Sequence, residues 1–319
     1  MLVKFWGTRG SLPAPLNERA VRTKIRQALI IARGRHFPSV DDIDAFIDEE
    51  LPFSVRGTFG GNSSCVEIAT RSEDYFLCDL GSGLREFGRC ATANHKSASR
   101  PRFNVFLSHL HWDHIMGFPF FAPAHIPEAT IRIYGCHGSM RRALRRQQST
   151  PYFPVRFDEL KASIDFIELQ PGRTYDISGI LVTPMLQHHA GDSYGYRFAY
   201  DDKAVVYATD NEHSLEAASE TTQLVEFYRD ADLLISDTMY SLADVLSKKA
   251  GWGHSSNIVA VELAHLSQVK HLVLFHHEPE ADDTTLEAIL TETRRYEELD
   301  RDAERLKITT AYDGLEVAV

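Results

Sequence analysis

The sequence predicts an α/β (α+β) fold in which two β-sheets pack together and helices cover their outer sides. Two observations lead to this prediction. Apolar runs of strand length alternate with segments of helical period along most of the 319 residues. The order is mixed, because antiparallel hairpins are expected early in the chain and strand–helix–strand units late. No repeat, low-complexity segment or long linker divides the chain, so we expect one domain over residues 1–319.

The first expected strand is Leu2–Trp6, and a helical insertion follows it over residues 17–56. The apolar residues that recur there at helical spacing are Val21, Ile25, Leu29 and Ile30. A second short helix is expected over Val40–Glu50, because Ser39 is a natural N-cap and acidic residues fill the first turn.

Strands and helices alternate in the rest of the chain. The expected strands are Cys65–Ala69, Tyr75–Asp79, Asn104–Leu107, Ile131–Tyr134, Ile164–Leu169, Ile180–Met185, Tyr194–Tyr200, Ala204–Ala208, Leu233–Ser236 and Leu272–Phe275. The expected helices are Leu84–Cys90, Ser139–Arg146, Leu215–Arg229, Tyr240–Lys249, Ser256–Leu266 and Thr284–Leu299. The two strands on either side of residues 201–203 are expected to form a hairpin.

The composition is that of a globular protein, with 43% hydrophobic and 25% charged residues, and it excludes a disordered chain. The formal net charge of −11 argues against a large nucleic-acid partner. Two basic clusters leave room for a short RNA or a nucleotide phosphate, although such runs are also common on solvated helix faces. Their residues are Arg141, Arg142, Arg145 and Arg146 in one helix and Arg19, Arg22, Lys24, Arg26, Arg33 and Arg35 in the insertion.

The four cysteines show no CxxC spacing, and two of them fall in apolar stretches. We therefore expect structural thiols in a reducing compartment rather than disulfides. The first residues show no secretory signal, and no window approaches the ~18 consecutive apolar residues of a membrane-spanning helix. A cytoplasmic protein with no membrane partner is expected.

Four metal-ligand side chains, His109, His111, Asp113 and His114, fall within one segment of the chain. They follow an apolar strand and precede an apolar helix start. A divalent metal requires several imidazoles and carboxylates that converge on one point. In a loop that leaves a strand end, residues i and i+2 can face one side and residues i+4 and i+5 another. This segment could therefore serve two adjacent metals.

The segment Ser108–His114 resembles the HxHxDH motif of the metallo-β-lactamase superfamily. Asp79, which precedes the residues Gly81-Ser-Gly83, resembles the first motif of that family, in which the aspartate supports the metal loop. The resemblance implies a four-layer αββα sandwich, here with a helical insertion near the N-terminus.

Three later segments are similar to the remaining motifs of the family, in the expected order. Gln187–Arg197 resembles the third motif of tRNase Z-like enzymes and phosphodiesterases, which implies His189 as a ligand and His188 as the alternative. Tyr207–Asp210 resembles the strand that ends in a metal-bridging aspartate. Leu272–Pro279 resembles the last motif, in which the first histidine after the apolar strand is the ligand.

The resemblance implies a dinuclear metal site. One metal would be held by His109, His111 and His189, the second by Asp113, His114 and His276, and Asp210 would lie between them. Zinc is the first choice for the two divalent ions, with manganese or iron as alternatives. Two such metals can share a hydroxide that attacks an ester bond, and Asp113 could orient or deprotonate the attacking water.

Gly251–Asn257 is similar to the His-Ser/Thr motif of tRNase Z-like enzymes. This similarity implies that His254 donates a proton to the leaving oxygen and that Ser255 lies near the substrate phosphate at a helix N-terminus. The alternative is that Ser255 or Ser256 only caps the helix and that His254 is a surface residue.

Two further segments offer candidates with equally strong alternatives. Thr58–Cys65 resembles an early glycine-rich segment of the family, in which Asn62 or Ser63 would line the substrate side, but it could be only a turn. Glu212 and His213 could bond to a metal ligand or cap the following helix.

These observations favour a metal-dependent phosphodiesterase that acts on a small nucleotide-type phosphodiester, cyclic or short. A tRNA 3′-processing endonuclease is an alternative, but no Gly/Pro-rich arm is visible between Ile115 and Gln187. Hydrolysis of a lactone or thioester is another. The non-enzymatic alternative is a metal-binding sensor or interaction module, although such descendants usually lose ligands. The frequent dimers of the family imply a homodimer.

Overall fold

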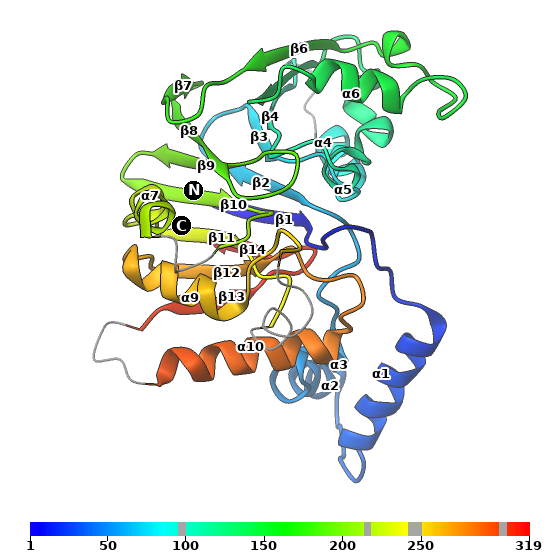
Figure 1. Cartoon of the computed structure of the whole chain (residues 1–319). Helices are drawn as coiled ribbons and strands as arrows, with labels where there is room; N and C mark the ends of the chain where they lie inside the picture. Colours follow the sequence, from blue (N-terminus) through cyan, green and yellow to red (C-terminus); the bar gives the residue numbers. More distant parts are fainter. Residues whose placement is uncertain (95–99, 214–217, 242–250, 300–304) are drawn as a thin grey trace.

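The computed structural model describes residues 1–94, 100–213, 218–241, 251–299 and 305–319, which form two seven-stranded sheets with helices on their outer sides (Figure 1). In spatial order, the first sheet contains β14 (Glu316–Ala318), β1 (Leu2–Gly7), β2 (Cys65–Ala69), β3 (Tyr75–Cys78), β4 (Arg102–Phe106), β5 (Thr130–Gly135) and β6 (Ser163–Glu168). The second sheet contains β13 (Lys307–Thr310), β12 (His271–Phe275), β11 (Leu233–Asp237), β10 (Lys203–Ala208), β9 (Ser193–Tyr200), β8 (Ile180–Gln187) and β7 (Tyr175–Ile177). The predicted fold class is confirmed.

Along the chain, most helices connect successive strands of the same sheet. The described α-helices are α1 (Glu18–Ile31), α2 (Val40–Ala45), α3 (Phe53–Arg56), α4 (Leu84–Asn94), α5 (Trp112–Ile115), α6 (Met140–Gln147), α7 (Ala218–Tyr228), α9 (Asn257–Leu266) and α10 (Asp283–Glu298). Shorter helical turns are η1 (Phe46–Glu50, a π-helix) and the 3-10 turns η2 (Phe118–Phe120), η3 (Ala122–His125) and η4 (Phe157–Glu159). In the described part of the chain, no helix combines the length and the apolar character needed to cross a membrane.

The core between the two sheets is built from aromatic and branched side chains of both. Phe5 of β1 packs on Phe275 of β12 with ring centroids 6.0 Å apart, and Phe106 of β4 packs on Phe198 of β9 at 5.1 Å. Each of these side chains is fully buried, which stabilises the fold by roughly 1.5–3 kcal/mol per residue. Separate apolar clusters hold the outer helices against each sheet, so the strand ends have fixed positions.

Each sheet has an antiparallel and a parallel part. The strands β1 to β3 pair antiparallel and β3 to β6 pair parallel, and the same change occurs at β10 in the second sheet. The hairpin around residues 201–203 is confirmed by the pairing of β9 with β10. The early antiparallel strands β1 to β3 and the late strand–helix–strand units from β10 to β13 are confirmed. Each half of the chain also contains the other kind of connection, because each half builds its own sheet.

All the expected strands have counterparts in the structure, but β7, β13 and β14 were not expected. These strands are three or four residues long and lie at sheet edges, where the apolar pattern is too short to be recognised. The expected helix Tyr240–Lys249 and the beginning of the expected helix Leu215–Arg229 fall largely on residues outside the described ranges.

Residues 17–56 form α1, α2, η1 and α3 between β1 and β2. The N-cap at Ser39 is confirmed, since its side chain accepts from Asp42 N and the Asp42 carboxylate accepts from Ser39 N. Helix α1 has no buried residue, and the four apolar residues that predicted it are 43–67% exposed. Helical spacing therefore predicted this helix correctly without indicating a buried face.

Candidate metal centre

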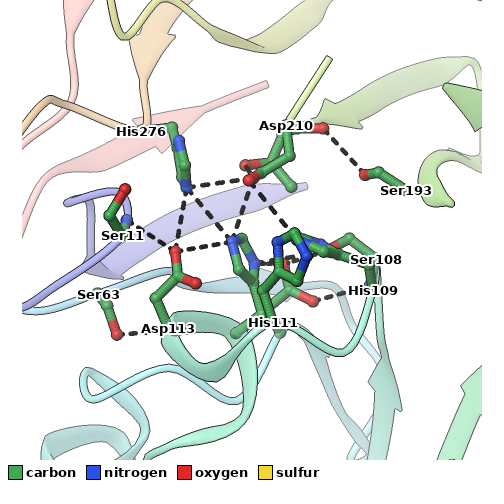
Figure 2. Close-up of polar contacts among 12 residues, drawn as sticks. Ser11, Ser63, Ser108, His109, His111, Asp113, Ser193, Asp210 and His276 are labelled. Atoms are coloured by element: carbon green, nitrogen blue, oxygen red, sulfur yellow. Dashed lines mark hydrogen bonds and ion pairs between the residues drawn. The ribbon is translucent and has the colours of Figure 1, made fainter. Parts of the chain in front are cut away.

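The metal-ligand side chains follow the ends of strands from both sheets. His109 to His114 follow β4 in the first sheet, whereas His189, Asp210 and His276 follow β8, β10 and β12 in the second. Asp210 and His276 have φ angles of 44° and 62°, in the left-handed region that most residues avoid but that Asp and His tolerate better than others. This conformation turns each side chain out of its strand and toward the ligands of the opposite sheet (Figure 2).

The first group of converging side chains contains His109, His111, His189 and Asp210. His189 Nε2 lies 3.3 Å from His111 Nδ1 and 3.7 Å from Asp210 Oδ2, and His109 Nε2 lies 3.6 Å from the same oxygen. His109 Nε2 is buried without a hydrogen-bond partner. A buried ring nitrogen that faces three other ligand atoms and lacks a hydrogen bond fits a bound cation.

The second group contains Asp113, His114, Asp210 and His276. The Nε2 atoms of His114 and His276 lie 3.3 Å apart, and each is 3.1–3.3 Å from Asp113 Oδ2 and Asp210 Oδ1. In a tetrahedral zinc site with bonds of ~2.0–2.1 Å, neighbouring ligand atoms are roughly 3.3 Å apart. The side chains therefore fit a metal of this size, and Asp210 offers one oxygen to each group (Figure 2).

Asp79 supports the loop that carries most of these ligands. Its Oδ1 accepts from Ser108 N at 2.8 Å, and its Oδ2 accepts from Ser108 Oγ at 2.8 Å and from Tyr207 Oη at 2.7 Å. His114 Nδ1 lies 2.7 Å from the same Oδ2. A carboxylate at one ring nitrogen directs the other nitrogen, here Nε2, to a metal.

His189 rather than His188 lies at the centre. His189 Nδ1 is 2.7 Å from the carbonyl oxygen of Gly253, which leaves Nε2 to face the first group. Gly253 has a φ of 86°, and a Cβ atom there would lie 2.6 Å from His189 Nδ1, so only glycine fits. His188 is exposed, and its side chain belongs to neither ligand group. Its backbone N–H donates to Asn211 Oδ1, and its carbonyl oxygen accepts from Glu212 N.

The protonation states of several side chains already suit metal binding. Burial lowers the pKa of His109 well below its ordinary value and also lowers that of His111. Burial raises the pKa of Asp113, but the adjacent His114 and bonds to neighbouring imidazoles bring it below its usual range. Burial lowers the pKa of His114, yet the surrounding carboxylates raise it well above the ordinary value. A metal binds neutral imidazoles and ionised carboxylates, so the environment favours the metal-binding form of His109, His111 and Asp113. His114 would release a proton when a metal binds, and its raised pKa reflects a site that stabilises positive charge.

His254 lies beside the centre and is paired with a residue that the sequence analysis missed. Its Nδ1 is 2.7 Å from Asp237 Oδ2, and only 8% of the residue is exposed. Burial lowers the pKa of His254, but Asp237 raises it, with a net value of about 9. Asp237 ends the apolar strand β11, and an aspartate directly after an apolar run, as at Asp79, is the signal that would have identified it. Together with His276 these two residues form a third group of converging ligand atoms.

The two serines that were expected near the substrate are buried. Ser63 is fully buried and donates to Asp113 O, and Ser255 is 2% exposed and bonds to Asn211 O. Ser256 caps α9 by accepting from Val259 N. Asn62 instead lines a cavity of about 770 Å³, although its amide also bonds to neighbouring side chains.

Glu212 neither contacts a metal-ligand side chain nor caps a described helix. Its carboxylate accepts from Gly251 N at 2.6 Å and from Gly253 N at 2.8 Å. His213 is partly buried, and the loss of solvent around its ring lowers its pKa to about 4. Its Nε2 lies 2.8 Å from Asn211 Nδ2.

The fold and the two ligand groups define a metalloprotein of the four-layer sandwich class. Residues 75–277 match a family model described as the Beta-lactamase superfamily domain, and the chain belongs to that family. It is a metal-dependent hydrolase with the metallo-β-lactamase fold, and this family binds divalent metal ions.

Individual relatives share this fold at low sequence identity. Ribonuclease Z of Thermoplasma acidophilum is 25% identical over 238 residues, which cover 57% of this chain and 71% of the relative. The metallo-β-lactamase fold protein YhfI from Bacillus subtilis has a TM-score of 0.64 at 16% identity and covers 99% of this chain and 98% of its own. The short form of human tRNase Z has a TM-score of 0.61 at 20% identity, and the match covers 100% of this chain and 99% of the human chain. The two structural likenesses show the fold alone.

Proposed function

We propose that this chain is a phosphodiesterase that hydrolyses a cyclic or short nucleotide-type phosphodiester with two divalent metal ions. Zinc is the first choice because imidazoles dominate the ligands, and manganese or iron are alternatives. The observation that supports the proposal best is that Asp210 offers Oδ1 to one ligand group and Oδ2 to the other. Two adjacent cations match the several oxygens that carry charge when a phosphodiester is cleaved.

Metals bound here would lower the pKa of a water and neutralise the phosphoryl oxygens. The side chains of the protein would orient the attacking water and the substrate. Asp113 Oδ2 accepts a hydrogen bond from Ser11 N at 2.8 Å, which fixes this carboxylate at the second group (Figure 2). From that position we propose that Asp113 orients the attacking water.

His254 is the proposed general acid. Asp237 occupies its Nδ1, so Nε2 is left to donate a proton to the leaving oxygen. The ring centroid of His254 lies 5.1 Å from the centroids of both His189 and His276, one ligand from each group. The acid is thus within reach of a phosphodiester that contacts both metals.

Asn62 is the proposed polar contact on the substrate side. The cavity that it lines also contains Ser82, Arg85, Met116 and Phe120, which combine one cation with apolar surface. The buried hydroxyls of the two serines, Ser63 and Ser255, support the loops instead, because both are already hydrogen-bonded.

A tRNA 3′-processing endonuclease remains the second candidate, because a curated relative is named ribonuclease Z. Two observations favour a smaller substrate. The residues between Ile115 and Gln187 contain no Gly/Pro-rich arm. Several cations of the basic clusters are also engaged within the chain, since Arg145 pairs with Asp158 and Lys24 with Asp283.

The compartment and the assembly are proposals as well. All four cysteines lie in the described residues and none is paired, which suits a reducing cytoplasm. A homodimer and a single domain over residues 1–319 remain expectations from the family resemblance and the absence of linkers.

The test is hydrolysis of bis(p-nitrophenyl) phosphate by purified protein loaded with zinc or manganese. The double variant His111→Ala/Asp210→Ala should lose turnover at least about a thousandfold, because it removes ligands from both groups. The exposed residue Asp202 lies in a hairpin turn, and Asp202→Ala should retain wild-type turnover. Wild-type turnover in the double variant would refute the dinuclear mechanism.

A further inference from the structure

Two tryptophans stand exposed next to the metal centre, and the proposed chemistry uses neither of them. Trp112 is 80% exposed and lies between the ligands His111 and Asp113. Trp252 is 62% exposed and precedes Gly253, whose carbonyl oxygen lies 2.7 Å from His189 Nδ1.

The backbone on both sides of Trp252 is held by one carboxylate. Glu212 accepts hydrogen bonds from Gly251 N and Gly253 N, the two residues that flank the tryptophan. The following residue, His254, is buried and bonded to Asp237. The indole is therefore exposed on a backbone that is already ordered, so little conformational entropy is lost when a ligand packs on it.

Both tryptophans are close in the chain to residues of the more exposed ligand group. In the first ligand group His111 is exposed and His189 is partly exposed, whereas every residue of the second group is buried. Trp112 follows His111 and begins α5, the helix after β4 of the first sheet. Trp252 precedes Gly253, whose carbonyl oxygen bonds to His189, in the loop before α9. The two exposed indoles thus neighbour, along the chain, His111 and the glycine bonded to His189, the two solvent-accessible residues of the first group.

We infer that Trp252, assisted by Trp112, stacks on the nucleobase of the substrate while the phosphodiester contacts the metals. The inference rests on the proposed phosphodiesterase function and adds the part of the substrate that the enzyme selects. An indole face on an ordered loop binds planar heteroaromatic rings, and every nucleobase offers such a ring. Stacking does not distinguish bases, so the enzyme should prefer nucleosidyl esters over alkyl esters without strong preference among the bases.

The test compares two phosphodiesters with the same leaving group, thymidine 5′-(4-nitrophenyl phosphate) and methyl 4-nitrophenyl phosphate. The wild type should show a much higher kcat/KM for the thymidine ester. Trp252→Leu keeps apolar bulk but removes the aromatic face, and it should lower this ratio by about 5- to 100-fold, with the methyl ester unaffected. Trp252→Phe should retain most of the ratio, and Trp112→Leu should lower it less.

Leu266 is 56% exposed at the far end of α9, and Leu266→Ala serves as the control for loss of exposed apolar surface. Metal content is measured in every variant. A wild-type ratio near one, an unchanged ratio in both Leu variants, or an equal loss with both esters would overturn the stacking inference. If the wild type hydrolyses neither ester, it is the proposed phosphodiesterase function that fails.

Discussion

Individual side chains decide where the ligand atoms of this centre point. Asp210 serves two groups because its left-handed backbone turns both carboxylate oxygens toward them. Asp79 and the Gly253 carbonyl direct the rings of His114 and His189 from behind. Asp237 acts in the same way on His254, and its contribution can be separated from that of the metals.

Asp237→Asn should impair His254, the proposed general acid, without removing metal. The variant loses the charge that raises the pKa of His254, so less imidazolium is present at neutral pH. Turnover of a 2′,3′-cyclic nucleotide should fall about 100-fold, because its alkoxide leaving group needs a proton. Turnover of bis(p-nitrophenyl) phosphate should change little, because p-nitrophenolate leaves without one. An equal loss on both substrates, at unchanged metal content, would contradict the role of the pair.

Strands are the elements that deliver these side chains. The apolar strands β3, β10 and β11 are each followed or ended by an aspartate, at Asp79, Asp210 and Asp237. An apolar strand is rigid because it is buried and paired on both sides, so its end is a precise position for a polar side chain. The strand β12 has a histidine at each limit, His271 at its beginning and the candidate ligand His276 after its end.

His271 should make the fold sensitive to acid. It is buried with Nε2 2.9 Å from Thr309 Oγ1 of β13, and burial lowers its pKa from 6.5 to about 4. Between these values the unfolded chain binds more protons than the folded one, so stability falls as the pH falls from 6.5 to 4. In His271→Gln the free energy of unfolding should fall less steeply over this range, by up to ~1.4 kcal/mol per pH unit.

Denaturant unfolding of His271→Gln and the wild type at several pH values measures this difference. Thr309→Val removes the hydrogen-bond partner but leaves the histidine buried, so it should lower stability while keeping the wild-type slope. Parallel pH profiles for His271→Gln and the wild type would disprove the assignment.

At the scale of the whole molecule, the metal centre joins the two sheets. Each ligand group combines residues that follow β4 of the first sheet with residues that follow strands of the second. The metals would therefore add a connection between sheets that are otherwise held by the apolar core between them.

Removal of metal should lower the thermal stability of the whole fold, because a ligand that binds only the folded state stabilises it. A chelator should lower the Tm of the wild type by several degrees, and added zinc should restore it. Asp210→Ala should melt at one temperature with or without chelator. A wild-type Tm that does not respond to the chelator would show that metal does not contribute to stability.

The sequence by itself determined the two-sheet architecture, nearly all the strands and the family, because apolar periodicity and the spacing of ligand residues are local properties of the chain. It also placed the ligand residues on the ends of strands. The sequence did not predict the three short edge strands, because their apolar patterns are too short. It also did not predict that α1 is exposed, because burial depends on what packs against an element.

Only the tertiary structure decided how distant segments meet. It brings His189 rather than His188 to the centre, pairs Asp237 with His254 and buries Ser63 and Ser255 in hydrogen bonds. Each of these outcomes depends on the direction of a side chain at a strand end or loop, which is set by backbone angles and by partners far away in the chain. Residue types and spacing indicated candidates for these positions, such as His189 before His188, but the partners that fix each side chain come from distant parts of the chain.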